Sequence, residues 1–176
     1  MPHTDVPVLI VGGSLVGMFA AALLGRLGIS TLVVEKHRGT AIHPRAALIY
    51  QRSMEIVRSF GIEDVVRRRS YEQFEPDGAI LSVESIAGAE LHWDVPHLNE
   101  HVRDLSPTER LFITQLALEP MLKARAEECG ARLEFNTELT GFAEDDDGVT
   151  AEVRHRGTGQ VSTVRARYMI AADGAH

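Results

Sequence analysis

The fold is decided by the stretch Val6-Pro7-Val8-Leu9-Ile10-Val11-Gly12-Gly13-Ser14-Leu15-Val16-Gly17, which continues into the apolar run 18–24. The pattern predicts a buried strand, a tight turn at the glycines and a buried helix. After the helix ends near Gly28, a second β-rich run, 30–34, leads into the acid Glu35. A strand–turn–helix–strand unit with an acid roughly 20 residues beyond the glycines is the fingerprint of a dinucleotide-binding fold.

Each part of the fingerprint has a physical role. Gly12 permits the sharp turn, the backbone near Ser14 approaches a pyrophosphate, and Gly17 lets the helix lie against the strand. The free N–H groups and the positive dipole end of the helix favour the phosphates. Glu35 follows the second strand, where a carboxylate accepts hydrogen bonds from a ribose diol.

Ser14 departs from the pattern, because it stands where the second glycine is expected. Its hydroxyl is expected to cap the helix or to donate to a phosphate oxygen. Three other interpretations stay open. The spacing of Gly12 and Gly17 matches a P-loop, although apolar residues follow where lysine and a hydroxyl residue are needed. A nucleophile elbow needs glycine where Val16 stands. The third is a helix packed through small residues without a ligand.

Composition narrows the function classes. The chain has 176 residues, enough for one domain or for one and a fragment, and a net charge of −7. This charge argues against nucleic-acid and anionic-membrane partners. The basic run Arg67–Arg69 is expected at the solvated end of a helix. A single cysteine, Cys129, excludes an internal disulfide. With no leader pattern and no long apolar span, a cytoplasmic location is expected.

The sequence pattern changes in the middle of the chain. A helix is predicted over about 46–59 and a shorter one over 62–69, followed by extended segments at 79–83 and 90–93. The stretch 97–108 is polar and irregular. It contains His97-Leu98-Asn99-Glu100-His101, which matches a zinc-helix string but lacks an apolar stripe. We expect a solvated loop there and no metal site.

The last third returns to a regular pattern. Thr114 is the expected N-cap of a helix in which Pro120 implies a late start or a kink. A strand is predicted at 131–135, a hairpin at 149–153 and 161–164, and a buried strand at 168–172.

In their order and spacing, these motifs resemble the flavoprotein aromatic hydroxylases, the single-component FAD monooxygenases related to p-hydroxybenzoate hydroxylase and the aromatic-polyketide hydroxylases. The similarity covers nearly all of the chain. It is carried by 11–17, Val33-Val34-Glu35-Lys36, His43-Pro44-Arg45-Ala46 leading into 54–58, Arg110 with Gln115 and Leu118-Glu119, and Ala171-Ala172-Asp173-Gly174.

The resemblance implies a fold and a domain division. The fold class is α/β, with a Rossmann-like FAD-binding βαβ domain, a three-stranded antiparallel β-meander and part of a second, antiparallel-sheet substrate domain. Residues 1–70 and 109–176 are expected to form two segments of the FAD-binding domain. Residues 71–108 are expected to be a partial excursion into the substrate domain.

The resemblance also implies the cofactor-binding residues. The FAD pyrophosphate is expected on the turn, the adenosine ribose on Glu35, and the flavin with its phosphate–ribityl chain near Arg45 and Gln115. A backbone contact to the adenine is expected at Leu139, and the Asp-Gly pair is associated with FAD and NADPH. The full expected set is Gly12, Gly13, Ser14, Leu15, Val16, Gly17, Glu35, Lys36, Arg45, Arg110, Gln115, Leu139, Asp173 and Gly174.

Structural interpretations of three of these residues stay open. Arg45 is also compatible with an ordinary ion pair at a helix start. Gln115 is also compatible with a polar first-turn residue, and Asp173 with a strand-end turn.

The implied chemistry is aromatic hydroxylation. NADPH, or NADH, reduces FAD, O2 adds to the flavin, and a C4a-hydroperoxide transfers one oxygen atom to a phenolic or polyketide ring. No proton-transfer residue is assigned in this chain. Two rival classes stay open: a related FAD enzyme, such as a halogenase, epoxidase or reductase, and a non-catalytic nucleotide-binding module. The module predicts no stimulation of NADPH oxidation by any aromatic compound.

The resemblance finally implies a missing part. Members of the family continue beyond the position that matches His176, with the rest of the substrate sheet and a second Gly-Asp flavin motif. We therefore expect an N-terminal portion that is catalytically incomplete alone and that takes a C-terminal half from its parent chain or another polypeptide.

Overall fold

The dinucleotide stretch folds as predicted into β1 (His3–Val11), the glycine turn, α1 (Leu15–Arg26) and β2 (Thr31–Glu35). The computed structural model describes residues 3–43, 45–76 and 78–174. Pro44 of the expected His-Pro-Arg-Ala motif and the terminal His176 lie outside the described residues. The chain divides into two compact units: a first unit of Met1–His43 and Leu118–His176, and a second unit of Pro44–Ala117.

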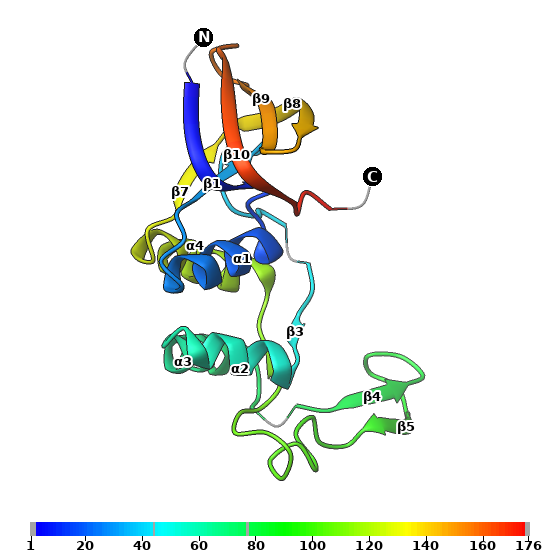
Figure 1. The fold of residues 1–176 in the computed structure, drawn as a ribbon. Helices are drawn as coiled ribbons and strands as arrows, with labels where there is room; N and C mark the ends of the chain where they lie inside the picture. The colour runs from blue at the N-terminus through cyan, green and yellow to red at the C-terminus, as the bar shows by residue number, and fades with distance from the viewer. Residues whose placement is uncertain (1–2, 44, 77, 175–176) are drawn as a thin grey trace. The chain divides into compact units, whose positions relative to one another are not determined.

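The first unit is built on a six-stranded sheet in the order β7-β2-β1-β10-β9-β8 (Figure 1). β1 pairs in parallel with β2 and β10, and β2 pairs in parallel with β7, so these strands share one carboxyl edge. β10, β9 and β8 form an antiparallel meander, which confirms the predicted fold class. The remaining strands are β7 (Arg132–Phe135), β8 (Thr137–Asp145), β9 (Gly148–His155) and β10 (Val161–Ala171).

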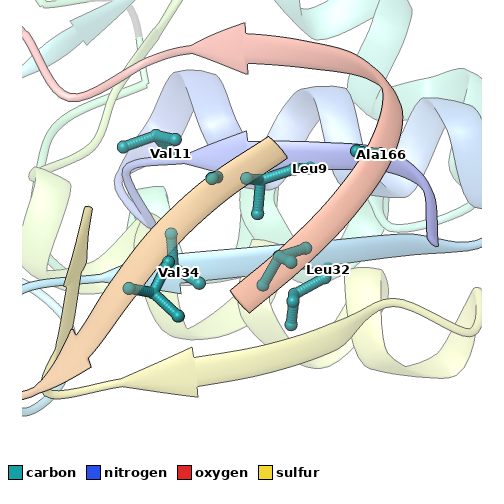
Figure 2. Close-up of a cluster of buried hydrophobic side chains, with 8 residues drawn as sticks. Leu9, Val11, Leu32, Val34 and Ala166 are labelled. Atoms are coloured by element: carbon teal, nitrogen blue, oxygen red, sulfur yellow. The ribbon is translucent and has the colours of Figure 1, made fainter. Parts of the chain in front are cut away.

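The core of this unit lies between the parallel strands and the meander. Side chains alternate along a strand, so Leu9 and Val11 of β1 point to the same face as Leu32 and Val34 of β2 (Figure 2). They meet four small or branched side chains of β9 and β10: Ala151, Val153, Val164 and Ala166. α1 packs against β1 and β2 and buries Met18, Ala21 and Ala22. The strands β1 and β2 are therefore covered by apolar groups, as their continuous apolar sequences predict.

Helix α4 (Gln115–Glu128) begins where its predicted cap stands. The Thr114 hydroxyl oxygen accepts a hydrogen bond from the Ala117 N–H at 3.3 Å, which confirms Thr114 as the N-cap. Pro120 lies inside this helix, where it removes one backbone donor. The expected late start is therefore wrong, because the cap fixes the first turn ahead of the proline.

The second unit contains short elements and two helices. Its elements are β3 (Leu48–Ile49), α2 (Gln51–Ser59), α3 (Glu63–Tyr71), β4 (Ile80–Val83), β5 (Glu90–Val95) and β6 (Leu111–Phe112). β4 and β5 form an antiparallel hairpin, as predicted for the extended segments. The helix predicted over 46–59 is wrong in its first turn, because Leu48 and Ile49 pair with Phe112 and Leu111.

The three strands of the meander agree with the resemblance, but the residue pattern differs from the structure in two places. It indicates no strand over 137–145, because Gly141 and acidic residues interrupt the alternation, although β8 pairs with β9 along its length. β10 is one strand rather than two segments, because Arg165 in its middle pairs with Thr150 of β9 on one side and with Asp5 of β1 on the other. Among the described residues, no helix has both the length and the apolar character needed to span a membrane.

Candidate functional site

Three chain segments meet at the carboxyl edge of the parallel strands in the first unit. β1 runs into Gly12, β2 ends at Glu35, and β10 runs into Ala172 and Asp173. The Gly12 N–H donates to the Val34 carbonyl at 2.8 Å, and the Ala172 N–H donates to the Val11 carbonyl at 2.7 Å. Open parallel sheets bind ligands at this edge.

The glycines of the turn are required by close packing of these segments. Gly12 has φ +104°, and a Cβ there would overlap the Ala172 carbonyl. A Cβ on Gly17 would overlap the Gly12 carbonyl, and a Cβ on Gly13 would lie 2.9 Å from the Glu35 Cβ. Real Cβ atoms do not approach so closely, so only glycine fits at these positions without a shift of the backbone.

Glu35 is fixed by backbone donors. One carboxylate oxygen accepts from the Gly13 N–H and the other from the His37 N–H, both at 2.7 Å. The side chain of Glu35 is only 12% exposed. The acid therefore ties the end of β2 to the turn, and each oxygen retains further lone-pair capacity for a ribose hydroxyl.

Ser14 does not make the capping bond that was one of the two roles expected for it. It occupies the N-cap position of α1, but its side chain makes no capping hydrogen bond. Its hydroxyl donates to a carboxylate oxygen of Glu119, and the other oxygen accepts from the Ala41 N–H at 2.6 Å. Sequence reasoning assigned no role to Glu119, because no local pattern links a helix residue to a turn 105 positions away.

These features fit the diphosphate and ribose of FAD. The glycine turn leads directly into α1, and the first backbone N–H groups of this helix lack intrahelical partners. The glycines allow the turn to pack closely against Ala172 and Glu35, and the Glu35 carboxylate accepts from the Gly13 N–H at the end of β2. A helix start of this kind binds anionic phosphates through its amides and its dipole.

The side chain of Arg156 and the backbone of Asn136 hold the loop after β2. Arg156 donates to the Lys36 carbonyl at 3.0 Å, and the Asn136 N–H donates to the His37 carbonyl at 2.7 Å. Arg156 also pairs with Glu138, and a hydrogen bond from Arg154 is the main cause of a lowered pKa at Glu138. Lys36 is thus placed by its backbone beside the acid that ends β2.

Three expected residues lie in the second unit. The Gln115 N–H donates to the Arg45 carbonyl at 3.2 Å, and the Ile113 N–H donates to the Ala47 carbonyl at 2.8 Å. These bonds continue the β3–β6 ladder and bring Arg45 to the start of α4. Arg110 directly precedes β6 and belongs to the same part of this unit.

Arg110 is held at both its backbone and its side chain. The buried amide of Asn99 accepts from the Arg110 N–H at 2.8 Å and donates to the Arg110 carbonyl at 3.1 Å. The Arg110 Nε donates to Gln51 at 3.1 Å, and the guanidinium lies 5.5 Å from the centre of the Tyr50 ring. Asn99 was not predicted, although it lies in the stretch considered for zinc.

The other expected positions are distributed along the first unit. Leu139 lies on β8, the last strand in the sheet order, with its side chain against the core cluster. Gly174 follows Asp173 with φ +93°. Leu15 and Val16 open α1, and Val16 is 68% exposed.

Two sequence expectations concern other charged groups. The stretch His97–His101 forms turns rather than a helix, and no group of His, Cys, Asp or Glu in the described chain is arranged to hold a metal ion. Arg68 and Arg69 of the basic run are exposed in the last turn of α3, as expected, whereas Arg67 pairs with Glu63 at 2.8 Å and with Glu109 at 2.9 Å.

Comparison with known proteins identifies related sequences. Residues 5–176 match the family model described as FAD binding domain. A 4-methyl-5-nitrocatechol 5-monooxygenase of a Burkholderia species is 50% identical over 98% of this chain and 32% of its own length. A tetracenomycin A2 monooxygenase-dioxygenase of Streptomyces glaucescens is 41% identical over 99% of this chain and 33% of its own.

Solved structures show the same fold. The flavin-dependent monooxygenase PieE, in complex with FAD and substrate, superposes with a TM-score of 0.88 at 35% identity over 100% of this chain and 31% of its own. An aklavinone-11 hydroxylase with FAD and aklavinone gives a TM-score of 0.85 at 33% identity over 99% of this chain and 34% of its own. The chain spans about a third of the length of these relatives.

Proposed function

We propose that this chain, which belongs to the FAD binding domain family, forms the FAD-binding portion of an NAD(P)H-dependent flavoprotein monooxygenase that hydroxylates an aromatic ring. The observation that carries the proposal is the glycine turn closed against Ala172 and Glu35 at the carboxyl edge of the sheet. The names of the relatives support hydroxylation of a phenolic or polyketide substrate over halogenation or reduction.

The proposed residue roles follow the two units. In the first unit, the turn Gly12–Gly17 holds the pyrophosphate, Glu35 accepts from the ribose diol, and Lys36 lies beside it. The backbone of Leu139 contacts the adenine, and the pair Asp173-Gly174 lies close to FAD and NADPH. In the second unit, Arg45, Arg110 and Gln115 bind the flavin or its phosphate–ribityl chain.

The proposed domain division assigns residues 1–70 and 109–176 to FAD binding and residues 71–108 to a substrate domain. The β4–β5 hairpin belongs to the latter range. Substrate contacts would come from this hairpin and from the polypeptide that completes it, either a longer parent chain or a second chain. A cytoplasmic location, where NADPH, O2 and a small aromatic compound are available, is part of the same proposal.

In this proposal the cofactor supplies the redox chemistry, and the protein binds and orients the cofactor. Bound FAD would supply electron transfer and oxygen activation, which side chains do not provide. The turn amides and Glu35 would fix the adenosine and diphosphate end, and Arg110, held by Asn99 and Gln51, would orient the other end. No proton-transfer residue is assigned within this chain.

The test is an absorbance spectrum of the purified chain before and after incubation with FAD and gel filtration. We expect flavin bands that co-elute with the protein and a saturable change in flavin fluorescence on titration. The variant Glu35→Ala should retain its circular dichroism spectrum and lose most of the flavin. A folded wild-type chain with no saturable FAD binding would overturn the proposed function.

A further inference from the structure

Glu119 is a buried carboxylate at the centre of three segments of the first unit. It is 1% exposed, although it comes from an otherwise apolar face of α4. Its oxygens accept from the Ser14 hydroxyl at the start of α1 and from the Ala41 N–H in the loop after β2. A carboxylate is buried at a cost unless it is hydrogen-bonded, so these contacts hold Glu119 and its partners in one arrangement.

Ser14 has the backbone of a capping residue but does not cap. Its φ of −90° and ψ of −167° lie in the extended region that N-cap residues adopt, and serine is a favoured residue there. A capping serine turns its oxygen onto the amides of the first helical turn. Here the side chain makes no such bond, and the hydroxyl donates a hydrogen bond to Glu119 instead.

We propose that Glu119 is a positioning residue for the dinucleotide turn. Glu119 accepts a hydrogen bond from the Ser14 hydroxyl and so holds the serine oxygen away from the first-turn amides of α1. Those amides are then left to bind the FAD pyrophosphate. This inference rests on the proposed function. It also explains how a serine is tolerated where the fingerprint has glycine, since the added side chain is kept out of the phosphate-binding surface.

The inference predicts competition when Glu119 is removed. Ser14 would then rotate onto the amides, and an N-cap of ordinary strength would raise the dissociation constant for a pyrophosphate ligand about fivefold. Loss of a negative charge beside an anion site acts in the opposite direction, because it strengthens anion binding. If the Glu119 variant binds the pyrophosphate ligand more weakly, the cause is therefore competition by the Ser14 hydroxyl and not the loss of the Glu119 charge.

The experiment measures dissociation constants in a double-mutant cycle. The variants are Glu119→Met, which keeps volume and removes both acceptors, Ser14→Ala, and the double variant; Glu119→Ala runs in parallel in case the methionine prevents folding. FAD, ADP as the pyrophosphate probe and adenosine without phosphates are titrated into each. We expect about fivefold weaker binding of FAD and ADP by Glu119→Met, unchanged adenosine binding, and full recovery in the double variant.

A conservative variant supplies a second readout. In Glu119→Gln, the side-chain oxygen must face the Ala41 N–H, so the amide group donates to the Ser14 oxygen and still holds it. FAD binding by Glu119→Gln should therefore stay within about twofold of wild type.

Three outcomes would overturn the inference. Equal weakening by Glu119→Met with and without the Ser14→Ala substitution would show that Glu119 acts through the loop at Ala41 or through packing. Unchanged or tighter binding by Glu119→Met and Glu119→Ala would show that Ser14 does not compete. A wild-type chain that does not bind FAD would overturn the proposed function itself, whereas wild-type binding without recovery in the double variant overturns only the role of Glu119.

Discussion

Gly17 is the position in the turn where a single methyl group has the largest expected effect. Its added Cβ would overlap the Gly12 carbonyl and touch Ile10, so β1 and α1 would have to separate. We expect Gly17→Ala to destabilise the chain by about 1–3 kcal/mol, the usual cost of overpacking. Urea unfolding measures this change. The matched control is Gly141→Ala, which meets nothing within 4 Å and should change stability by less than about 0.5 kcal/mol. Equal stability of both variants would contradict the packing argument.

Glu35 gives a second prediction at the residue scale. Both of its oxygens face N–H donors, so Glu35→Gln places an amide donor against one of them. A hydrogen bond to a charged group contributes about 1.5–3 kcal/mol, and we expect FAD binding to weaken about tenfold or more. Fluorescence titration measures this, with the exposed Glu144→Gln as control. Unchanged FAD affinity in Glu35→Gln would remove Glu35 from the site.

Local spacing explains which of these residues could be predicted from the sequence. The glycines and Glu35 lie in one βαβ unit, where chain order fixes spatial order. Glu119 and Asn99 could not be found in this way, because their hydrogen-bond partners belong to other sequence motifs. Glu119 accepts from Ser14, and Asn99 accepts from the backbone of Arg110. The sequence also misplaced the Ser14 hydroxyl, since capping is a local preference and Glu119 overrides it.

At the scale of elements, α3 is held by a charge network with a predictable pH dependence. Burial raises the pKa of Glu63 and of Glu109, but hydrogen bonds from Thr108 and Arg67 to the first, and from Arg103 and Arg67 to the second, leave both pKa values below normal. A carboxyl whose folded pKa is lowered stabilises the fold above its unfolded pKa and loses that effect as pH falls.

We therefore expect the urea midpoint to fall between about pH 5 and pH 3, and to fall less in Glu63→Gln/Glu109→Gln. Asp145, whose pKa the Arg165 hydrogen bond lowers to about 2, acts with the same sign in the first unit. The measured quantity is accordingly the difference between wild type and the double variant. An identical pH dependence in the two proteins would contradict the network.

Helices and strands are predicted well where an apolar pattern extends over many consecutive residues. They are predicted poorly where a short strand depends on pairing with a distant part of the chain. The strands β1 and β2 and the helix α1 follow from continuous apolar runs. The sequence predicts helix at β3 because Leu48 and Ile49 also fit a helical apolar pattern, and only pairing with β6, more than sixty residues away, makes them a strand. The reason is different for β8, whose pairing with β9 is a local hairpin: Gly141 and acidic residues interrupt its strand pattern.

The β4–β5 hairpin exposes apolar side chains on an isolated two-stranded sheet. Trp93, the single tryptophan of the chain, is 46% exposed, and Leu91 is 67% exposed. We expect red-shifted Trp93 emission that acrylamide quenches efficiently, because water reaches the ring. The control is free tryptophan, which sets the limit of full exposure. Blue-shifted emission with little quenching would show that Trp93 is covered in solution.

For the whole molecule, stability should be unevenly distributed along the chain. β1, β2 and β10 pair on both sides within the sheet and carry the core cluster, so their amides open only with global unfolding. β4 and β5 pair only with each other, and a two-stranded hairpin is marginally stable in water. Hydrogen exchange with mass spectrometry should therefore show fast exchange in 80–95 and slow exchange in 8–11, 31–35 and 163–166. Added FAD should protect 12–17 further and leave 80–95 unchanged, because the proposed pyrophosphate contacts lie on the turn. Equal protection of the hairpin and the central strands would contradict this distribution, and protection of the hairpin by FAD alone would place it in the cofactor site.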